Sequence, residues 1–379
     1  MKILFTCWRL TGGGAERVCV DVANGLLQLG HETAILADFT QPVTYHPLPG
    51  VKRIQTAPYS NAVTWRISAL RQMVDVMRSF RPDAVVCILY NRATAARIAS
   101  MLTVKCPVVA SDHNAFERPP YAPMRRRQHF DKFTVNRWLD ALTVLTRADA
   151  RVIGNRLRHV YVMPNPLGIV PADAVPPKER IVLAVGRLDE WHCKGFDLLV
   201  EAWKDIAPLC RGWKLRIVGH GSDASLAKLK DMGRGVRDVE FLPYTENIRD
   251  EYRRAAVFVL SSRYEGFGLV LTEAMSQGCA CVACDFRGRQ SEIVTDGTDG
   301  LIVPIDDAHA LAMAMKHLIV DTPAREALQR QAIKGVARFA PDVIARRWER
   351  MLMEVTARKR GSKNQDKTSE KTNDKTSLS

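Results

Sequence analysis

The sequence predicts an α/β fold made of two domains with parallel sheets. Short apolar runs alternate with amphipathic stretches along most of the 379 residues, a pattern typical of repeated βα units. This length suits two domains of about 100 to 200 residues each. A stretch without periodicity, Pro164–Pro177, contains five prolines and separates two sets of apolar runs. We therefore expect two Rossmann-like domains, at residues 1–168 and 169–340.

The strands are expected where the apolar runs are short and leave room for a crossover helix before the next run. In the first domain these runs are 2–7, 32–37, 51–56, 84–90, 107–112, 141–146 and 159–163. In the second domain they are 181–185, 214–218, 239–242, 257–261, 280–283 and 301–303.

The end of the chain has only helical periodicity, with apolar residues at Val343, Ile344, Trp348, Met351 and Leu352. We expect a helix at 341–359 that returns to the first domain. Residues 360–379 contain no aromatic residue and repeat polar residues with a period of about four. Such a composition buries too little surface to fold, so this tail is predicted to be disordered.

Composition favours a protein with an anionic partner and gives no sign of a membrane-spanning helix. The net charge of +14 suggests an anionic partner, and residues 1–168 hold 22 basic against 11 acidic side chains. No apolar run exceeds seven residues, whereas a membrane-spanning helix needs about 20. The first residues continue directly into a predicted strand, without the apolar segment of a signal peptide, so we expect a cytoplasmic protein. The nine cysteines are scattered and odd in number, which favours reduced thiols.

The densest motif is Glu265-Gly-Phe-Gly-Leu269, followed by Glu273, between a predicted strand and a predicted helix. Ligands of open α/β sheets bind outside the carboxyl ends of the strands. Gly266 and Gly268 permit close approach of a ligand to the backbone, and the N–H groups of the helix start suit a phosphate or a sugar hydroxyl. Taken alone, Glu265 is equally compatible with an acidic residue favoured by the helix dipole.

A second motif has the same setting: Gly186-Arg187-Leu follows a predicted strand, and Lys194-Gly195 precedes a helix. Weaker patterns are Gly219-His-Gly after another strand and Tyr244 after the next one. Separately, each of these is common, and an isolated arginine and lysine are usually solvated surface residues.

In the first half, Gly12-Gly13-Gly14 lies at a strand-to-helix turn, where a phosphate or a sugar can approach the backbone. A dinucleotide fingerprint would require glycine where Arg17 stands, although Asp38 after the second strand keeps that alternative open. Asp112-His113 ends a further strand, and either residue could point toward a ligand.

Together these motifs resemble glycosyltransferase family 4, the group 1 glycosyltransferases, which are retaining enzymes of the GT-B fold with two Rossmann-like domains facing a cleft. By this resemblance, the second domain binds a nucleotide-sugar and the first the acceptor. Arg187 and Lys194 would bind the diphosphate, Glu265 the donor sugar and Glu273 the ribose, while His113 would face the transferred sugar. We assign catalytic roles to Glu265, His113, Arg187 and Lys194. The donor-binding set is Gly13, Gly14, Gly186, Arg187, Lys194, Gly219, Tyr244, Glu265, Gly266, Phe267, Gly268, Leu269 and Glu273.

The resemblance implies transfer of a hexose or N-acetylhexosamine, from a UDP-linked donor, to a lipid-linked or oligosaccharide acceptor in bacterial surface polysaccharide or lipopolysaccharide synthesis. No Asp-x-Asp motif is present, so we expect neither a metal nor a cofactor. Two alternatives remain, a sugar-nucleotide epimerase of the same fold and a non-catalytic basic protein that binds nucleic acid, although no recognisable nucleic-acid motif accompanies the cations.

Basic residues interleaved with apolar ones, at 65–81 and 124–130, suggest instead that the first domain contacts an anionic membrane surface, which would make the protein peripheral on the inner face of the membrane. The alternative is a solvated basic face whose apolar side packs on the sheet.

Overall fold

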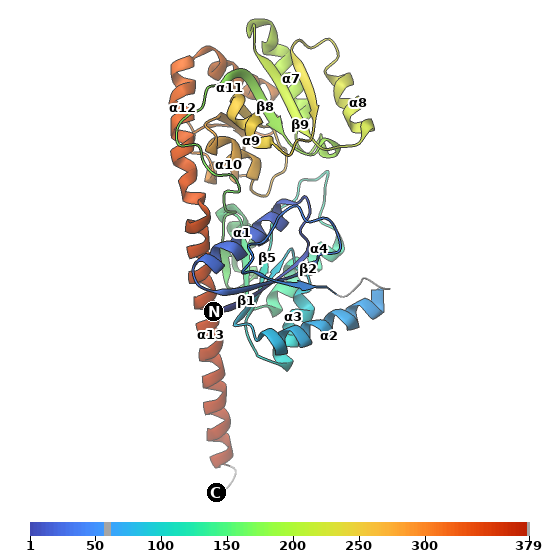
Figure 1. Ribbon diagram of the computed structural model, residues 1–379, viewed down its shortest axis with the longest axis vertical. Helices are drawn as coiled ribbons and strands as arrows, with labels where there is room; N and C mark the ends of the chain where they lie inside the picture. Colours follow the sequence, from blue (N-terminus) through green and yellow to red (C-terminus); the bar gives the residue numbers. More distant parts are fainter. Residues whose placement is uncertain (57–61, 377–379) are drawn as a thin grey trace. The chain divides into compact units, whose positions relative to one another are not determined.

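The computed structural model describes residues 1–56 and 62–376, with side chains for 1–56 and 66–361. The chain forms two compact units, shown in Figure 1. Unit 1 consists of Met1–Leu145, Asp149–Pro166 and Pro341–Ser379, and unit 2 of Thr146–Ala148 and Leu167–Ala340. The passage from unit 1 to unit 2 at Pro166 falls in the proline-rich stretch, where the fixed backbone of proline interrupts regular structure.

Unit 1 contains a parallel sheet of seven strands in the order β3-β2-β1-β4-β5-β6-β7. The strands are β1 (Lys2–Arg9), β2 (Glu32–Asp38), β3 (Lys52–Gln55), β4 (Ala84–Ile88), β5 (Val108–Ser111), β6 (Ala141–Val144) and β7 (Val160–Val162). Each coincides with a predicted apolar run. The inner strands are buried on both faces, which explains why their sequences are continuously apolar rather than alternating.

The helices of unit 1 cover this sheet. They are α1 (Gly14–Gln28), α2 (Ala62–Phe80), α3 (Ala93–Leu102), α4 (Arg126–Phe130), α5 (Asn136–Trp138), α6 (Arg147–Ile153) and α13 (Pro341–Thr376), with the π-helix η1 (Asp131–Val135) and the 3-10 turn η2 (Gly154–Arg156). Of α6, Arg147 and Ala148 fall in unit 2.

Helix α2 uses its apolar side for the core of unit 1. Met73, Met77 and Phe80 are buried there with residues of β1, β2 and α3. These three residues therefore cannot lie on a membrane, and this part of the membrane hypothesis is wrong. The exposed face of α2 keeps Arg71 and Arg78 in solvent, while the side chain of Trp65 lies outside the described residues.

Unit 2 contains a parallel sheet of six strands in the order β10-β9-β8-β11-β12-β13. They are β8 (Glu179–Val185), β9 (Lys214–Gly219), β10 (Val239–Pro243), β11 (Ala255–Leu260), β12 (Ala280–Cys284) and β13 (Leu301–Val303). The helices are α7 (Phe196–Ile206), α8 (Asp223–Met232), α9 (Ile248–Arg254), α10 (Leu269–Ser276), α11 (Ala308–Val320) and α12 (Thr322–Gly335). Four 3-10 turns complete the unit: η3 (Leu188–Glu190), η4 (Ala207–Leu209), η5 (Gln290–Glu292) and η6 (Val336–Phe339).

Helix α13 belongs to unit 1 although it follows unit 2 in the chain, and it packs along α1 (Figure 1). Close contact needs a glycine in α1, because a Cβ on Gly25 would lie 2.7 Å from Cβ of Ala345. His31 Nε2 and Glu349 Oε1 are 2.8 Å apart, which adds a polar link. The helix continues to Thr376, through residues predicted to be disordered, since extending an existing helix needs no new nucleation.

Candidate active site

The candidate site in unit 2 lies where the order of the strands reverses. From β8 the chain moves outward to β9 and β10, and then returns to β11 on the other side of β8. In open α/β sheets, ligands bind at the carboxyl ends of the strands beside such a reversal. The loop after β8, residues 186–195, and the loop after β11, residues 261–268, both begin at this place.

Hydrogen bonds hold these two loops together. The backbone N–H of Arg263 donates to the carbonyl of Cys193 at 2.9 Å, and the Ser261 hydroxyl donates to the carbonyl of Lys194 at 2.8 Å. The guanidinium of Arg263 also donates to Asp197 Oδ1 at 2.6 Å, which anchors the first turn of α7. The side chains carried by the two loops therefore have fixed relative positions.

Lys194 and Glu265, predicted separately from two motifs, form an ion pair between these loops. Lys194 Nζ is 2.8 Å from Glu265 Oε2, and the two side chains are only 19% and 17% exposed. The Ser262 hydroxyl donates to the same carboxylate oxygen at 3.3 Å. Burial by itself lowers the pKa of Lys194, but the Glu265 carboxylate more than compensates and raises it above its usual value. The lysine consequently remains a cation throughout the physiological range.

Two glycines permit the close packing beneath this pair. A Cβ on Gly219, at the end of β9, would lie 1.7 Å from the carbonyl oxygen of Gly186. A Cβ on Gly195 would lie 2.0 Å from the carbonyl oxygen of Ser261, and the φ of Gly195 is +66°. Any larger residue would push the loops apart, so the glycines of these motifs have a packing role.

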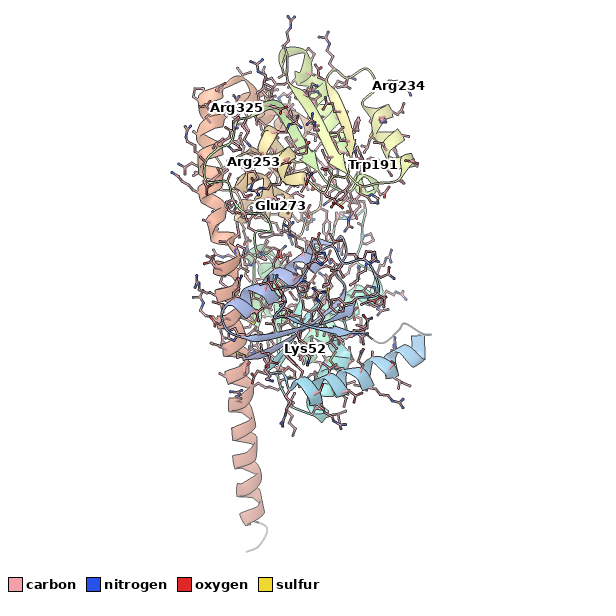
Figure 2. All side chains as sticks on the ribbon, in the orientation of Figure 1. Lys52, Trp191, Arg234, Arg253, Glu273 and Arg325 are labelled. Carbon is pink, nitrogen blue, oxygen red and sulfur yellow. The ribbon has the colours of Figure 1, made fainter. Side chains whose placement is uncertain are left out.

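The remaining predicted residues of unit 2 differ in exposure. Arg187 is 62% exposed and pairs with Glu190 at 2.9 Å, and Tyr244 is also exposed. Glu273, labelled in Figure 2, is buried on α10 and accepts a hydrogen bond from the Tyr252 hydroxyl at 3.0 Å. The other members of the predicted set, Gly266, Gly268 and Leu269, form the turn into α10, where Gly268 is the N-cap and Leu269 the first helical residue.

Phe267 contributes to this turn in a different way from the other residues. Its ring is buried and packs edge-to-face on Phe339, with the ring centroids 5.5 Å apart. The side chain is therefore part of the core of unit 2, and only its backbone is available to a ligand at the turn.

In unit 1, the triglycine turn and His113 follow carboxyl ends of the sheet. Helix α1 begins at Gly14 with Gly13 as N-cap, directly after β1. His113 follows β5, and its Nε2 lies 3.0 Å from the Ser111 hydroxyl. Burial lowers the pKa of His113 to about 4. This histidine is therefore neutral near pH 7 and suits hydrogen bonding to a hydroxyl rather than charge stabilisation.

Asp112 has a structural position. Its carboxylate is 1% exposed and lies 2.7 Å from Nζ of Lys132, which is itself buried. It also accepts hydrogen bonds from the Tyr90 hydroxyl at 3.0 Å and from the backbone N–H of Asn114 at 2.9 Å. Because these partners occupy both carboxylate oxygens, His113 is better suited than Asp112 to contact a ligand.

Sequence reasoning missed the loop after β4, which lies where the strand order of unit 1 reverses between β1 and β4. The predicted strand extended to residue 90, whereas β4 ends at Ile88. Leu89, Tyr90 and Arg92 then adopt left-handed backbone angles, with φ of 50°, 60° and 55°. Such strain in residues other than glycine concentrates at functional sites. The segment contains no glycine, and Asn91 was the only residue in it that favours a turn.

No group of three or more potential metal ligands occurs among the described residues. The nine cysteines are free, and Cys279, Cys281 and Cys284 are buried, as expected for apolar structural thiols. Burial raises the pKa of the Cys284 thiol to about 12, so it is a poor nucleophile near pH 7.

Two family models match successive parts of the chain. The model described as Glycosyltransferase Family 4 matches residues 12–171, and the one described as Glycosyl transferases group 1 matches residues 179–321. The chain belongs to the family 4, group 1 glycosyltransferases. The two parallel-sheet units are those of the GT-B fold. The family relationship predicted from the motifs is confirmed by the two family models.

Two curated relatives match this glycosyltransferase over nearly their whole length. The GalNAc-alpha-(1->4)-GalNAc-alpha-(1->3)-diNAcBac-PP-undecaprenol alpha-1,4-N-acetyl-D-galactosaminyltransferase of Campylobacter jejuni is 26% identical over 94% of this chain and 99% of its own. The amylovoran biosynthesis glycosyltransferase AmsD of Erwinia amylovora is 26% identical over 90% of this chain and 96% of its own. An exopolysaccharide phosphotransferase of Streptomyces coelicolor is 33% identical, but the match spans 58% of this chain and only 24% of that protein.

Among solved structures, Anabaena HepE in complex with UDP and glucose has the same fold as this glycosyltransferase. The TM-score is 0.74 over 93% of this chain and 99% of HepE, with 18% sequence identity.

Proposed function

We propose that this glycosyltransferase moves a hexose or an N-acetylhexosamine from a UDP-linked donor to a lipid-linked or oligosaccharide acceptor, with retention of the anomeric configuration. The observation that carries the proposal is the Lys194–Glu265 pair at the strand reversal of unit 2. It joins, in one place, a cation suited to a diphosphate and a carboxylate suited to sugar hydroxyls.

The cations supply the chemistry that a departing nucleoside diphosphate requires. Negative charge develops on the diphosphate as the glycosidic bond breaks, and fixed positive groups stabilise that charge. The ammonium group of Lys194 carries three N–H donors, and the contact with Glu265 uses one of them. Arg187 follows β8 at the carboxyl edge of the same sheet, and its exposed guanidinium suits bidentate contacts to phosphate oxygens. We therefore assign diphosphate binding to Arg187 and Lys194, without a metal ion.

The carboxylates would bind the two sugars of the donor. Glu265 would accept hydrogen bonds from hydroxyls of the transferred sugar, and Glu273 from the ribose. The Tyr252 hydroxyl, 3.0 Å from Glu273 Oε2, would hold that carboxylate in place. Neutral His113 of unit 1 would contribute a hydrogen bond to the transferred sugar.

The acceptor proposal draws on the relatives. One is named for transfer to an undecaprenyl-diphosphate-linked saccharide, and another for biosynthesis of amylovoran. We propose a role in bacterial surface polysaccharide or lipopolysaccharide synthesis on the same grounds.

The test is a transfer assay with a panel of UDP-, GDP- and ADP-sugars, together with a thermal-shift screen, because a bound donor raises stability. Arg187→Ala, Lys194→Ala and Glu273→Gln should each weaken transfer at least tenfold. Arg211→Ala, which removes an exposed arginine of unit 2, should not. Full transfer by all three site variants would refute the assignment, and an altered sugar released without an acceptor would instead indicate an epimerase. The anomeric configuration of the product, read by NMR, tests retention.

We further propose that unit 1 acts at an anionic membrane surface from the cytoplasmic side, through the exposed residues Arg125, Arg126, Arg127 and Phe130. Among the described residues, no helix has the length and apolar character needed to cross a bilayer. Sedimentation with anionic and neutral vesicles tests this contact. Arg125→Gln/Arg126→Gln/Arg127→Gln should lower binding to anionic vesicles, and equal binding of the unaltered protein to both vesicle types would refute it.

A further inference from the structure

A basic pocket of about 600 Å³ lies in unit 1, at the end of its sheet opposite to the triglycine turn and His113. Among its lining residues, Asp140 and His159 directly precede β6 and β7, so the pocket is at the amino ends of these strands. The triglycine turn and His113 follow the carboxyl ends of strands in the same parallel sheet. The pocket is therefore separate from the residues of unit 1 that are assigned to glycosyl transfer.

The lining is strongly cationic. Five of the lining side chains are cations and only Asp140 is an acid, with the cations being Arg137, Arg156, Arg158, Arg358 and Lys359. The single carboxylate is already neutralised. Lys359 Nζ lies 2.6 Å from its Oδ1, and an arginine outside the pocket, Arg97, donates to its Oδ2 at 3.0 Å. The pocket keeps a large excess of positive charge.

Two of these arginines have no hydrogen-bonding or ion-pair partner in the described part of the protein. Within the described part of the chain, the guanidinium groups of Arg137 and Arg158 make no hydrogen bond or ion pair, whereas Arg358 donates to the Tyr161 hydroxyl and to the carbonyl of Asp140. Unlike charges attract over several ångströms at a protein surface, and like charges held together without counter-charges repel. An anion that entered the pocket would relieve this repulsion.

His159, which also lines the pocket, is affected by the same cations. Burial lowers its pKa, and the charges of Arg358 and Arg158 lower it further, against the opposing effect of Glu354 and Asp140. Its backbone is left-handed, with φ of 56°, although it is not a glycine.

We propose that this pocket binds a phosphate group. Guanidinium groups match phosphate oxygens in shape and charge, and several arginines around one pocket suit a phosphate better than a carboxylate. The phosphate could belong to a soluble compound or to a phospholipid headgroup, and both present the same anionic oxygens to Arg137 and Arg158.

The experiment measures binding by the full chain to two probes. Inorganic pyrophosphate is titrated by calorimetry into chains that also carry Arg187→Ala and Lys194→Ala, so that the proposed diphosphate site of unit 2 does not contribute. Phosphatidylglycerol vesicles are compared with phosphatidylcholine vesicles by sedimentation. Arg137→Glu/Arg158→Glu reverses two pocket charges. The control Arg71→Glu/Arg78→Glu makes the same change of net charge on the exposed face of α2 in the same unit. Thermal melting verifies that both variants are folded.

The pocket variant should bind at least tenfold more weakly than the control to pyrophosphate or to phosphatidylglycerol vesicles. Loss of pyrophosphate binding identifies a soluble phosphate, and loss confined to the vesicles identifies a headgroup. No binding of either probe, or equal loss in the two variants, would overturn the proposal. Neither readout depends on glycosyl transfer, so the result stands apart from the proposed activity.

Discussion

Lys194 and Glu265 come from different loops of unit 2 and meet at 2.8 Å, largely shielded from solvent. This contact should affect both the stability of unit 2 and glycosyl transfer, and the two effects can be measured separately. Each charge neutralises the other in a partly buried setting, and both groups lie at the strand reversal where ligands of such sheets bind.

Removing one partner should therefore affect stability and transfer differently from removing both. Lys194→Met leaves Glu265 uncompensated and should lower the free energy of unfolding by about 1 to 3 kcal/mol, with transfer reduced about 10²- to 10³-fold. Lys194→Met/Glu265→Gln should recover most of the stability but none of the transfer. Urea denaturation and initial-rate assays measure the two effects. Lys204→Met, an exposed lysine on α7, should change neither quantity, and transfer by the double variant at the unaltered rate would contradict the assigned role.

Gly219 should not tolerate a methyl group. In Gly219→Ala the new Cβ would lie 1.7 Å from the carbonyl oxygen and 2.9 Å from the carbonyl carbon of Gly186, and both of these atoms belong to the backbone. This clash is removed only if β9 and the loop after β8 move apart. We expect that movement to lower the free energy of unfolding by about 2 to 4 kcal/mol and to weaken donor binding. Chemical denaturation and donor titration measure these losses. Gly361→Ala is the control, because no atom lies within 4 Å of its Cβ position and alanine favours a helix.

The buried pair of Asp112 and Lys132 should be far more sensitive than an exposed pair. Lys132→Met would leave the carboxylate buried beside Tyr90, at an expected cost of about 3 to 5 kcal/mol. Lys2→Met disrupts the exposed pair with Glu32, whose atoms are 2.9 Å apart, and should cost no more than about 1 kcal/mol. Equal losses in the two variants, measured by urea denaturation, would show that burial is not the deciding factor.

His113 should make stability depend on pH in the acidic range. Its folded pKa of about 4 lies below the ordinary value of 6.5, so the unfolded chain binds the proton first as pH falls. The contribution of neutral His113 is complete above about pH 6.5 and is lost progressively toward pH 4, by about 1 to 3 kcal/mol. Unfolding free energies at pH 7, 5.5 and 4.5 should decline more steeply for the unaltered protein than for His113→Gln. Parallel declines would contradict the depressed pKa.

The strands of the fold could be predicted from the sequence because parallel strands buried on both faces have short, continuously apolar sequences. All thirteen strands of the structure fall within or beside the predicted runs. Helix α2 shows the limit of this reasoning. Its alternation of arginines with Met73, Met77 and Phe80 was equally compatible with a membrane surface and with a core, and only the sheet beneath it decides for the core.

For the candidate site, the sequence indicated the motifs but not the contacts between them. Lys194 and Glu265 are 71 positions apart, and no local pattern specifies that their side chains pair. Likewise, Asp112 and His113 were indistinguishable as neighbours at the end of a strand. The partners Lys132 and Tyr90, brought from other elements, occupy Asp112 and leave His113 as the candidate.

The sequence by itself determined the α/β class, the two successive sets of strands and the glycine-containing loops that follow them, because hydrophobic periodicity and glycine act over a few residues. Tertiary structure alone decided which cations have partners. Lys194 and Lys132 are held by carboxylates, whereas Arg137 and Arg158 gather around a pocket whose only acid, Asp140, is already paired. A pairing energy depends on distance and burial, and neither is defined until strands far apart in the chain lie side by side.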